Sequence, residues 1–392
     1  MDEDAPTTSD LAKALDHGSR DPGPRKALQG LHPMPLDPLP ENPLVTVLIT
    51  NYNYGRFIGE ALESVSTQTY GRLEIVVCDD GSTDDSCDVV QAAAARDDRI
   101  RLISQANAGQ AAAFNTAYGA SSGDVLCFLD ADDLYLPHKV QTVLDTFRRD
   151  RSGLLLHHMM IVDADRNEVQ RIPTFTRLES GWIGQRVIRR GGRWRWMPTS
   201  GMCLRRELAE AIFPVPEEPF RIDADTFILV LAPLLARVVG VEEILGLYRL
   251  HGANAYSRVR VDSSSIGRTI HSISTAVDQV NERLVQLEVE PVRLDAGRNV
   301  ELTEQRFLAD AIGGSASRGN LAIRYVKMMQ TIVGDDLYGT AQKLWAAMLY
   351  GVVVILPTRL RARWASGSLG ISHAKERLRR LREGARPTYR GA

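Results

Sequence analysis

Between residues 44 and 129, apolar runs that suit buried strands alternate with segments of helical periodicity. The first run, 44–50, is continuously apolar apart from its threonines and rich in β-branched residues, which is typical of a strand covered on both faces. Further runs at 73–78, 100–104 and 124–129 are separated by stretches with apolar residues at helical spacing. This alternation predicts an α/β fold with a doubly wound, mostly parallel sheet and helices on both faces.

Each of these expected strands ends in polar residues that an apolar interior does not need. Because ligands bind beyond the carboxyl ends of parallel strands, we expect the polar runs to line one crevice. Each run alone also fits a turn or a helix cap, but their joint placement favours a binding site. The runs are Thr50-Asn51-Tyr52-Asn53-Tyr54, Asp79-Asp80-Gly81-Ser82-Thr83-Asp84, Asn107-Ala108-Gly109-Gln110 and Asp130-Ala131-Asp132-Asp133.

The last of these runs places three carboxylates within four residues, directly after the apolar strand that ends in Phe128-Leu129. Mg²⁺ and Mn²⁺ take oxygen ligands, and they share their coordination sphere between one or two carboxylates and the phosphates of a substrate. The run therefore predicts a divalent metal site for a nucleoside diphosphate, with Asp130 and Asp132 as ligands. The alternative is that Asp132 or Asp133 caps a helix expected over residues 134–147, which needs only one carboxylate.

The other strand ends offer candidates for holding a nucleotide. The ring of Tyr52 can stack on a nucleobase, and Asp79 or Asp80 can accept a hydrogen bond from a base N–H or a ribose hydroxyl. A nicotinamide-dependent dehydrogenase would use a similar sheet, but the first strand leads into Thr-Asn-Tyr-Asn-Tyr-Gly without the G-x-G-x-x-G pattern. A net charge of −2 gives no general attraction to nucleic acid.

In their order along the chain, these motifs resemble those of the family 2 glycosyltransferases of the GT-A fold, from residue 45 to about residue 257. The resemblance implies inverting transfer of a sugar from a nucleoside diphosphate sugar, UDP favoured, to a hydroxyl on a glycan, lipid-linked or small-molecule acceptor. It also implies Mn²⁺ or Mg²⁺ as cofactor and a role in surface polysaccharide or glycoconjugate synthesis. The implied nucleotide-binding residues are Thr50, Tyr52, Asn53, Asp79, Asp80, Asn107, Gly109 and Asp130, and the implied metal ligands are Asp130, Asp132 and His251.

The resemblance continues downstream, where residues 199–206 are similar to the acceptor-side strand of the family. Residues 222–229 lie where the family usually has its general base, in a Glu-Asp pair that opens a helix. This alignment makes Asp225 the base, although Ala224 stands where Glu is common, and it leaves Asp223 as the alternative, since either carboxylate can instead cap the helix. If the altered pair has lost turnover, the rival function is a non-catalytic module that binds a nucleotide sugar or a partner.

The stretch 182–196 contains five arginines and three tryptophans. Aromatic rings stack on sugar faces, and basic groups suit an acidic acceptor or a lipid diphosphate, so Trp194 and Trp196 are predicted acceptor contacts. The alternative is a surface loop whose tryptophans fill the core.

Outside the glycosyltransferase-like domain, expected over 44–258, the chain carries two further segments. Residues 1–43 read as a disordered Pro-rich extension, and because this segment contains no apolar leader we expect a cytoplasmic location. Residues 259–392 are expected to be helical with a basic tail, since 359–392 hold ten Lys or Arg against two Glu.

The uncharged run 344–356 is too short to span a membrane. Followed by arginines and Trp364, it predicts peripheral contact with the inner face of the membrane through 344–364, or else a buried helix beside a solvated basic one.

Overall fold

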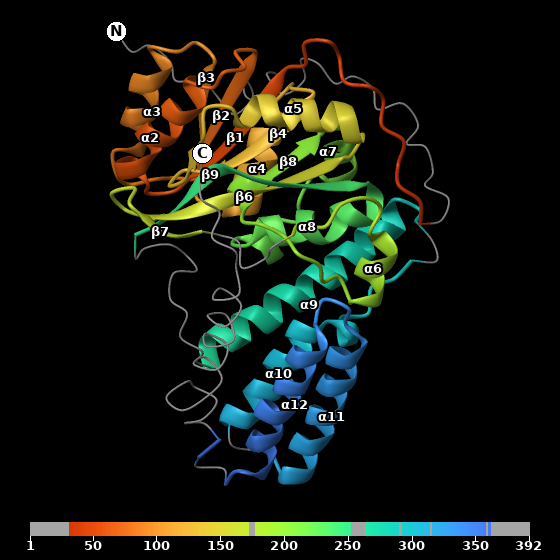
Figure 1. Ribbon diagram of the computed structural model, residues 1–392. Helices are drawn as coiled ribbons and strands as arrows, with labels where there is room; N and C mark the ends of the chain where they lie inside the picture. Colours follow the sequence, from red (N-terminus) through yellow and green to blue (C-terminus); the bar gives the residue numbers. More distant parts are fainter. Residues whose placement is uncertain are drawn as a thin grey trace, which may run out of the picture.

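The computed structural model describes residues 31–171, 177–251, 263–289, 292–313, 316–357 and 360–361. In this part of the chain nine strands form one sheet in the order β3-β2-β1-β4-β8-β6-β9-β5, with β7 paired to β6 (Figure 1). The strands are β1 (Val45–Asn51), β2 (Leu73–Asp79), β3 (Ile100–Ser104), β4 (Val125–Asp130), β5 (Leu134–Tyr135), β6 (Leu154–Asp163), β7 (Glu168–Arg171), β8 (Met202–Arg205) and β9 (Val238–Leu250).

The part of the sheet that is built from β1 to β4 is parallel, as the sequence predicts. Strand β1 pairs in parallel with both β2 and β4, and β2 pairs in parallel with β3. Beyond β4 the sheet is mixed, because β8 is antiparallel to β4 and β6, whereas β9 runs parallel to β6. The predicted α/β fold is confirmed.

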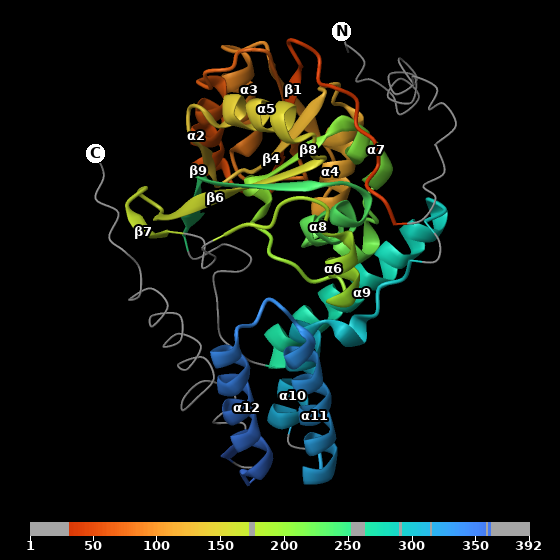
Figure 2. The same ribbon diagram turned by 45° about the vertical axis from the view of Figure 1, so that its right-hand side comes forward.

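Helices cover both faces of this sheet because side chains along each strand point alternately to opposite sides. Val47 and Ile49 of β1 pack into the core with α2 (Gly55–Ser66), α3 (Ser86–Ala94) and α5 (Lys139–Asp150). Leu48 points the other way, into the core with α4 (Gln110–Gly119), α6 (Gly184–Arg189), α7 (Arg206–Ile212) and α8 (Ala224–Leu235). Figure 2 shows α5 and α8 on opposite sides of the sheet.

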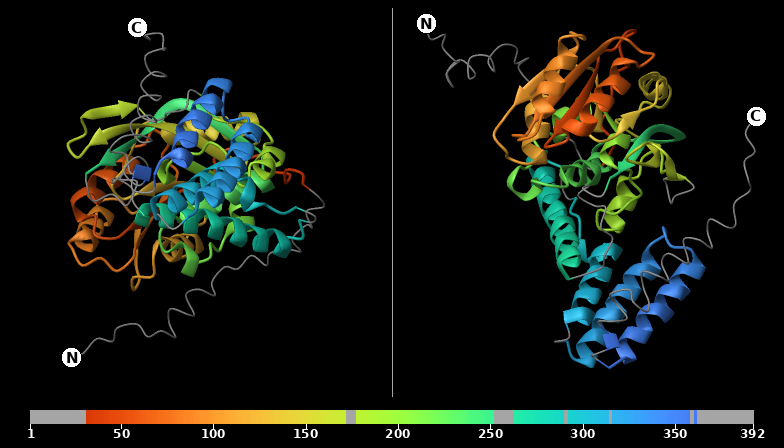
Figure 3. Two further views of the ribbon diagram at one scale, coloured as in Figure 1. Left: turned by 90° about the horizontal axis from the view of Figure 1, so that it is seen from below. Right: turned by 90° about the vertical axis from the view of Figure 1, so that its left-hand side faces the viewer.

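A helical region follows the sheet and projects away from it (Figure 3). Its helices are α9 (Ser263–Gln286), α10 (Val300–Gly313), α11 (Arg318–Gly334) and α12 (Thr340–Ile355). Helix α9 joins two cores, since Val277 and Val280 pack beneath the sheet whereas Ile266 packs with α10–α12. The sheet-side core reaches Leu294, so the packing does not divide at residue 258, where the sequence suggests a boundary.

The described part of the predicted N-terminal extension, residues 31–43, forms no helix or strand and lies against the sheet domain. The Met34 amide donates to the Leu235 carbonyl at 2.7 Å, and Arg205 donates to the carbonyl of Asp37 at 2.7 Å. Residues 1–30, which make up most of the predicted extension, lie outside the described residues.

Helix α12 buries one face and exposes the other. Leu349 and Val353 pack into the bundle core, whereas Leu344, Met348 and Ile355 are exposed. The predicted alternative of a buried helix thus holds for one face of α12, and peripheral membrane contact through the other face stays a prediction. None of the described helices combines the length and the apolar character that a membrane crossing requires. The basic tail beyond residue 361 lies outside the described residues.

Candidate active site

The parallel register brings the polar strand ends together, as the sequence predicts. Thr50 lies between Cys78 on β2 and Asp130 on β4, and Asn51 lies beside Asp79. The Asn51 amide donates to Asp79 Oδ2 at 2.7 Å, and the Ser82 hydroxyl donates to the same oxygen at 2.6 Å. Although burial opposes them, these bonds hold the pKa of Asp79 below its ordinary value. Asp79 is 1% exposed, so its carboxylate is buried among these partners.

Asp80 holds the turn after β3 in place. Its carboxylate accepts hydrogen bonds from the amides of Ala108 at 2.9 Å and Gly109 at 2.8 Å, and from Gln105 at 2.7 Å. Gly109 has a φ of +97°, and a Cβ there would lie 2.6 Å from the Cα of Arg221, so the turn requires glycine. Asp79 and Asp80 thus hold the loops at the strand ends, and direct nucleotide contact by either carboxylate stays a prediction.

The loop after β1 is bonded to the turn that follows β2. Tyr52 is 47% exposed, which leaves its ring accessible for stacking. Asn53 has a φ of +58°, and its position is fixed by bonds between its amide and Ser82 Oγ at 2.8 Å and between its Oδ1 and the Thr83 amide at 2.7 Å. In the turn after β3, Asn107 Oδ1 accepts from Arg221 at 2.9 Å.

The acidic run does not cap a helix. After Asp130 the chain forms the short strand β5, and α5 begins at Lys139 with His138 at its N-cap. The helix expected from residue 134 therefore starts five residues later, and neither Asp132 nor Asp133 is near enough to cap it.

Arg249, near the end of β9, and His251, just beyond it, contact the acidic run. Arg249, 1% exposed, donates from its amide to Asp133 Oδ1 and from Nε to the Asp132 carbonyl, both at 2.9 Å. Its guanidinium also pairs with Glu60 at 2.7 Å, so it supports the acidic turn. His251 Nε2 lies 2.9 Å from Asp132 Oδ2. Residues 252–262, which follow His251 in the chain, lie outside the described residues.

The carboxylates form a crowded negative cluster. Burial and the neighbouring charges of Asp133, Asp132 and Asp225 raise the pKa of Asp130 well above its ordinary value. Asp133 is fully buried, and its Oδ2 has no hydrogen-bond partner among the described residues. A bound cation would relieve this crowding, and oxygen donors suit Mg²⁺ or Mn²⁺.

The protein carboxylates suit such an ion only if oxygens from a bound substrate or from water complete its coordination. Within the described ranges, no three His, Cys, Asp or Glu side chains are grouped so as to hold a metal by themselves. Asp130 and Asp132 supply two carboxylates, and Mg²⁺ commonly takes the remaining oxygens from phosphates and water. His251, predicted as a third ligand, directs Nε2 at Asp132.

The two candidates for the general base lie at the start of α8. Asp225 Oδ2 accepts from Thr199 Oγ1 at 3.0 Å, and the charge of Asp225 contributes to the raised pKa of Asp130, so the Asp225 carboxylate neighbours the acidic cluster. Asp223 occupies the N-cap position with a left-handed φ of +68°, but its side chain makes no capping bond. Burial, followed by the charge of Asp225, raises the pKa of Asp223 to about 6. Burial also raises the pKa of Asp225.

Sequence reasoning missed Lys139, which lies behind the acidic cluster. Its ammonium is fully buried, donates to the Ser200 carbonyl at 2.9 Å and lies 3.2 Å from the centre of the Tyr135 ring. Ser200 Oγ in turn accepts from the Asp130 amide at 3.0 Å. The available signal was a lysine on the apolar face of the expected helix. Because lysine is rarely buried without a partner, a lysine at such a position indicates a polar partner in the interior.

Trp194 and Trp196, the predicted acceptor contacts, pack against the protein core. Trp194 is 4% exposed, and its indole donates to the Leu229 carbonyl at 2.7 Å, while Trp196 is half-buried against the same core. The predicted acceptor role of Trp194 is therefore wrong, because its ring fills the core. Arg190 and Arg193 pair with Asp336 and Asp335, which fastens the stretch to the helical region.

Comparison with known proteins gives the family of this fold. Residues 46–213 match the family model described as "Glycosyl transferase family 2". An uncharacterized glycosyltransferase of Nostoc sp. is 35% identical over 265 residues, which cover 67% of this chain and 82% of that protein. Chondroitin synthase of Escherichia coli is 43% identical over 110 residues, but these cover 28% of this chain and only 16% of the synthase.

A solved structure shares the fold. The structure of S. aureus TarS 1–349 in complex with UDP-GlcNAc matches with a TM-score of 0.51 and 16% identity, covering 85% of this chain and 92% of that one. At this identity the match concerns the fold alone.

Proposed function

We propose that this chain, which belongs to glycosyltransferase family 2 and is a glycosyltransferase, transfers a sugar from a nucleoside diphosphate sugar to an acceptor hydroxyl with inversion. The observation that supports this reaction is the proximity of Asp132 and Asp225 to Asp130, which ends the parallel strand β4, since α/β sheets bind ligands beyond the carboxyl ends of their strands. Membership of this family disfavours the rival function, a non-catalytic module that binds a nucleotide sugar or a partner. Surface polysaccharide or glycoconjugate synthesis is the setting that we infer, by analogy with the family.

The donor nucleotide is proposed to occupy the crevice between the β1 loop and the turn after β3. The exposed ring of Tyr52 is available to stack on the base, and Thr50, Asn53, Asn107 and Gly109 line the approach to it. We favour UDP, the nucleotide of the donor in the TarS complex. In this proposal Asp79 and Asp80 act chiefly by shaping the two loops, since their oxygens already accept bonds from Ser82, Ala108 and Gly109.

Asp130 and Asp132 are the proposed ligands of Mn²⁺ or Mg²⁺. When bound, the ion supplies Lewis-acid stabilisation of the negative charge that develops on the departing diphosphate. Arg249 and His251 fix the main chain and the carboxylate of Asp132, which keeps both ligands oriented before the donor arrives. Lys139, through Ser200, holds the end of β4 that carries Asp130.

Asp225 is the proposed general base. A carboxylate beside the acceptor hydroxyl removes its proton as the oxygen attacks the anomeric carbon from the side opposite the diphosphate, which inverts the configuration in one displacement. The Thr199 hydroxyl holds the Asp225 carboxylate beside Asp130. Asp223 remains the alternative base, and its pKa of about 6 suits proton abstraction near neutral pH.

The donor site is tested by titrating UDP, GDP and dTDP into the protein calorimetrically, with Mn²⁺ and with EDTA. We expect one nucleotide, UDP, to bind with Mn²⁺ and to bind at least tenfold more weakly in EDTA, since two carboxylates and the phosphates share the ion. Mn²⁺ alone should bind weakly. Equal affinity in EDTA would contradict the metal ligands, and no binding of any nucleotide would contradict the donor site. Hydrolysis of the UDP-sugar by wild-type protein excludes the non-catalytic alternative.

Peripheral membrane contact is proposed to use the exposed face of α12. Leu344, Met348 and Ile355 are 67%, 56% and 71% exposed, and a basic segment follows them in the sequence. We expect Leu344→Ser with Met348→Ser to lower co-sedimentation with anionic vesicles by roughly tenfold or more, because each side chain contributes apolar burial. The control is Val285→Ser, which changes an exposed residue on α9. Equal losses in both variants, or no vesicle binding by the wild type, would argue against membrane contact.

A further inference from the structure

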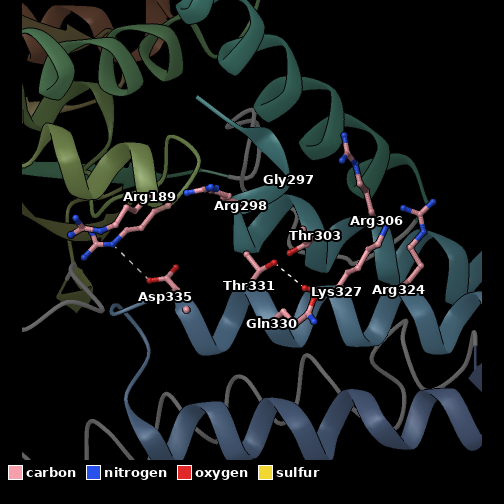
Figure 4. A pocket seen from close by; sticks show the side chains of 12 residues that line it. Arg189, Gly297, Arg298, Thr303, Arg306, Arg324, Lys327, Gln330, Thr331 and Asp335 are labelled. Carbon is pink, nitrogen blue, oxygen red and sulfur yellow. Dashed lines mark hydrogen bonds and ion pairs between the residues drawn. The ribbon is translucent and has the colours of Figure 1, made fainter. Parts of the chain in front are cut away.

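A pocket of about 470 Å³ lies where the end of α6, the turn η3 (Ala296–Arg298), α10 and α11 meet (Figure 4). Cationic side chains dominate its wall, and the carboxylate that lines it is Asp335. The cations are Arg189, Arg190, Arg298, Arg306, Arg324 and Lys327. The pocket is separate from the crevice that holds Asp130 and Asp225, and the proposed transfer reaction assigns it no role.

Some of these cations are already neutralised within the protein. Arg190 lies 3.0 Å from Glu179 and 2.6 Å from Asp336, Arg298 lies 3.5 Å from Asp295, and Arg324 lies 2.9 Å from Asp310. Arg189, Arg306 and Lys327 form no ion pair with any residue in the described ranges. The pocket therefore carries unbalanced positive charge, which suits an anionic ligand.

The positive charge extends along the pocket. On α11 Lys327 lies three residues after Arg324, and Gly334 lies seven residues after Lys327, so the three residues share one face of the helix. Ten residues of helix span about 15 Å. Arg189 lies toward the Asp335 end of the pocket and Arg306 toward the Arg324 end, with Thr303 and Thr331 between them (Figure 4). A single phosphate cannot reach both ends, whereas a chain with several anionic groups can.

The pocket is connected to the candidate base through α9. Arg306 donates to Ser274 Oγ at 3.4 Å, and Ser272, two residues earlier on the same helix, hydrogen-bonds Asp223. An α-helix with its side chains is about 10 Å across, so the cationic pocket and the start of α8 lie on different sides of one helix. A ligand chain longer than the pocket would need to pass one helix to bring its end to the carboxylates.

From this arrangement we propose that the pocket binds the acceptor, and that the acceptor is an extended acidic glycan with repeated phosphate or carboxylate groups. This role rests on the proposed glycosyl transfer, but binding of a polyanion in the pocket does not require turnover. A flat lipid surface fits the observations less well, because the cations line a hollow between helices. Hydroxyl and amide groups of Thr303, Thr331 and Gln330 between the cations provide hydrogen bonds to sugar.

The test measures binding of labelled polyphosphate, labelled polygalacturonate and labelled neutral dextran to the full chain by fluorescence anisotropy, and binding of phosphatidylglycerol vesicles by co-sedimentation, both at physiological salt. We expect a polyanion to bind and dextran not to bind. The double variant Arg306→Gln with Lys327→Gln should bind it roughly tenfold more weakly or worse, since bonds to charged groups contribute strongly. Arg306→Lys with Lys327→Arg should retain binding. The matched control, Arg96→Gln with Arg318→Gln, removes two cations outside the pocket and should leave affinity within about twofold.

Each arm separates one source of binding. A preference for polyphosphate or for polygalacturonate supports the inference and identifies the anionic group of the acceptor. Equal loss in the matched control, equal binding of dextran, or binding confined to phosphatidylglycerol vesicles would overturn it. UDP affinity, measured on the same variants, should not change. If the wild type binds a polyanion but not UDP, the proposed donor site alone is overturned. If it binds UDP but no polyanion, the acceptor pocket alone is overturned.

Discussion

Asp225→Asn is expected to lower kcat by roughly 10²–10⁴-fold while leaving the affinity for UDP with Mn²⁺ nearly unchanged. The amide keeps the shape of the carboxylate and can still bond Thr199, but it cannot accept the proton of the acceptor hydroxyl. The UDP-sugar and its metal are held by other residues in the proposal, so their binding should not depend on Asp225. Steady-state transfer and calorimetry on the same preparation measure the two effects.

The pH profile of kcat/KM identifies the base. A base acts when it is deprotonated, so the rate should fall as pH falls through its pKa. Burial raises the pKa of Asp225 above its ordinary value, which moves this acidic limb upward in pH, and for Asp223 the limb would lie near its pKa of about 6. Asp223→Asn is the matched control. If Asp223→Asn abolishes turnover while Asp225→Asn remains active, Asp223 is the base.

The placement of the site could be predicted from sequence because strand ends are local features. Thr50, Asp79 and Asp130 each follow an apolar run, and parallel pairing then brings them to one edge of the sheet. The same local reasoning erred where a distant residue decides the outcome. The periodicity over 134–147 suggested one helix, but pairing of Leu134 with Leu247 on β9 makes the first residues a strand.

The roles of individual side chains depended on partners that are remote in sequence. Asp80 is bound by the amides of Ala108 and Gly109, so its carboxylate is engaged in a loop 28 and 29 residues away. Trp194 enters the core because the Leu229 carbonyl on α8 accepts its N–H. The cationic pocket was beyond prediction for the same reason, since Arg189 and Lys327 meet only when the bundle packs beside α6.

Asp130→Asn is expected to abolish metal-dependent UDP binding and transfer, and at the same time to make the free protein more stable. The Asp130 carboxylate is crowded by those of Asp132, Asp133 and Asp225, and this repulsion is an energetic cost of a site that awaits a cation. Asparagine removes one of the charges and keeps the volume. The melting temperature without ligand should therefore rise by roughly 2 °C or more, whereas UDP with Mn²⁺, which stabilises the wild type, should leave the variant unchanged.

Asp145→Asn is the matched control, because Asp145 is an exposed carboxylate on α5, outside the cluster, and its loss should alter neither stability nor nucleotide binding appreciably. A fall in the melting temperature of Asp130→Asn would mean that the carboxylate has a structural partner and that the cluster is not under repulsion. Retained Mn²⁺-dependent UDP binding would remove Asp130 from the ligand set. Because the stability change and the binding change have opposite signs, a variant that merely folds poorly cannot imitate the expected result.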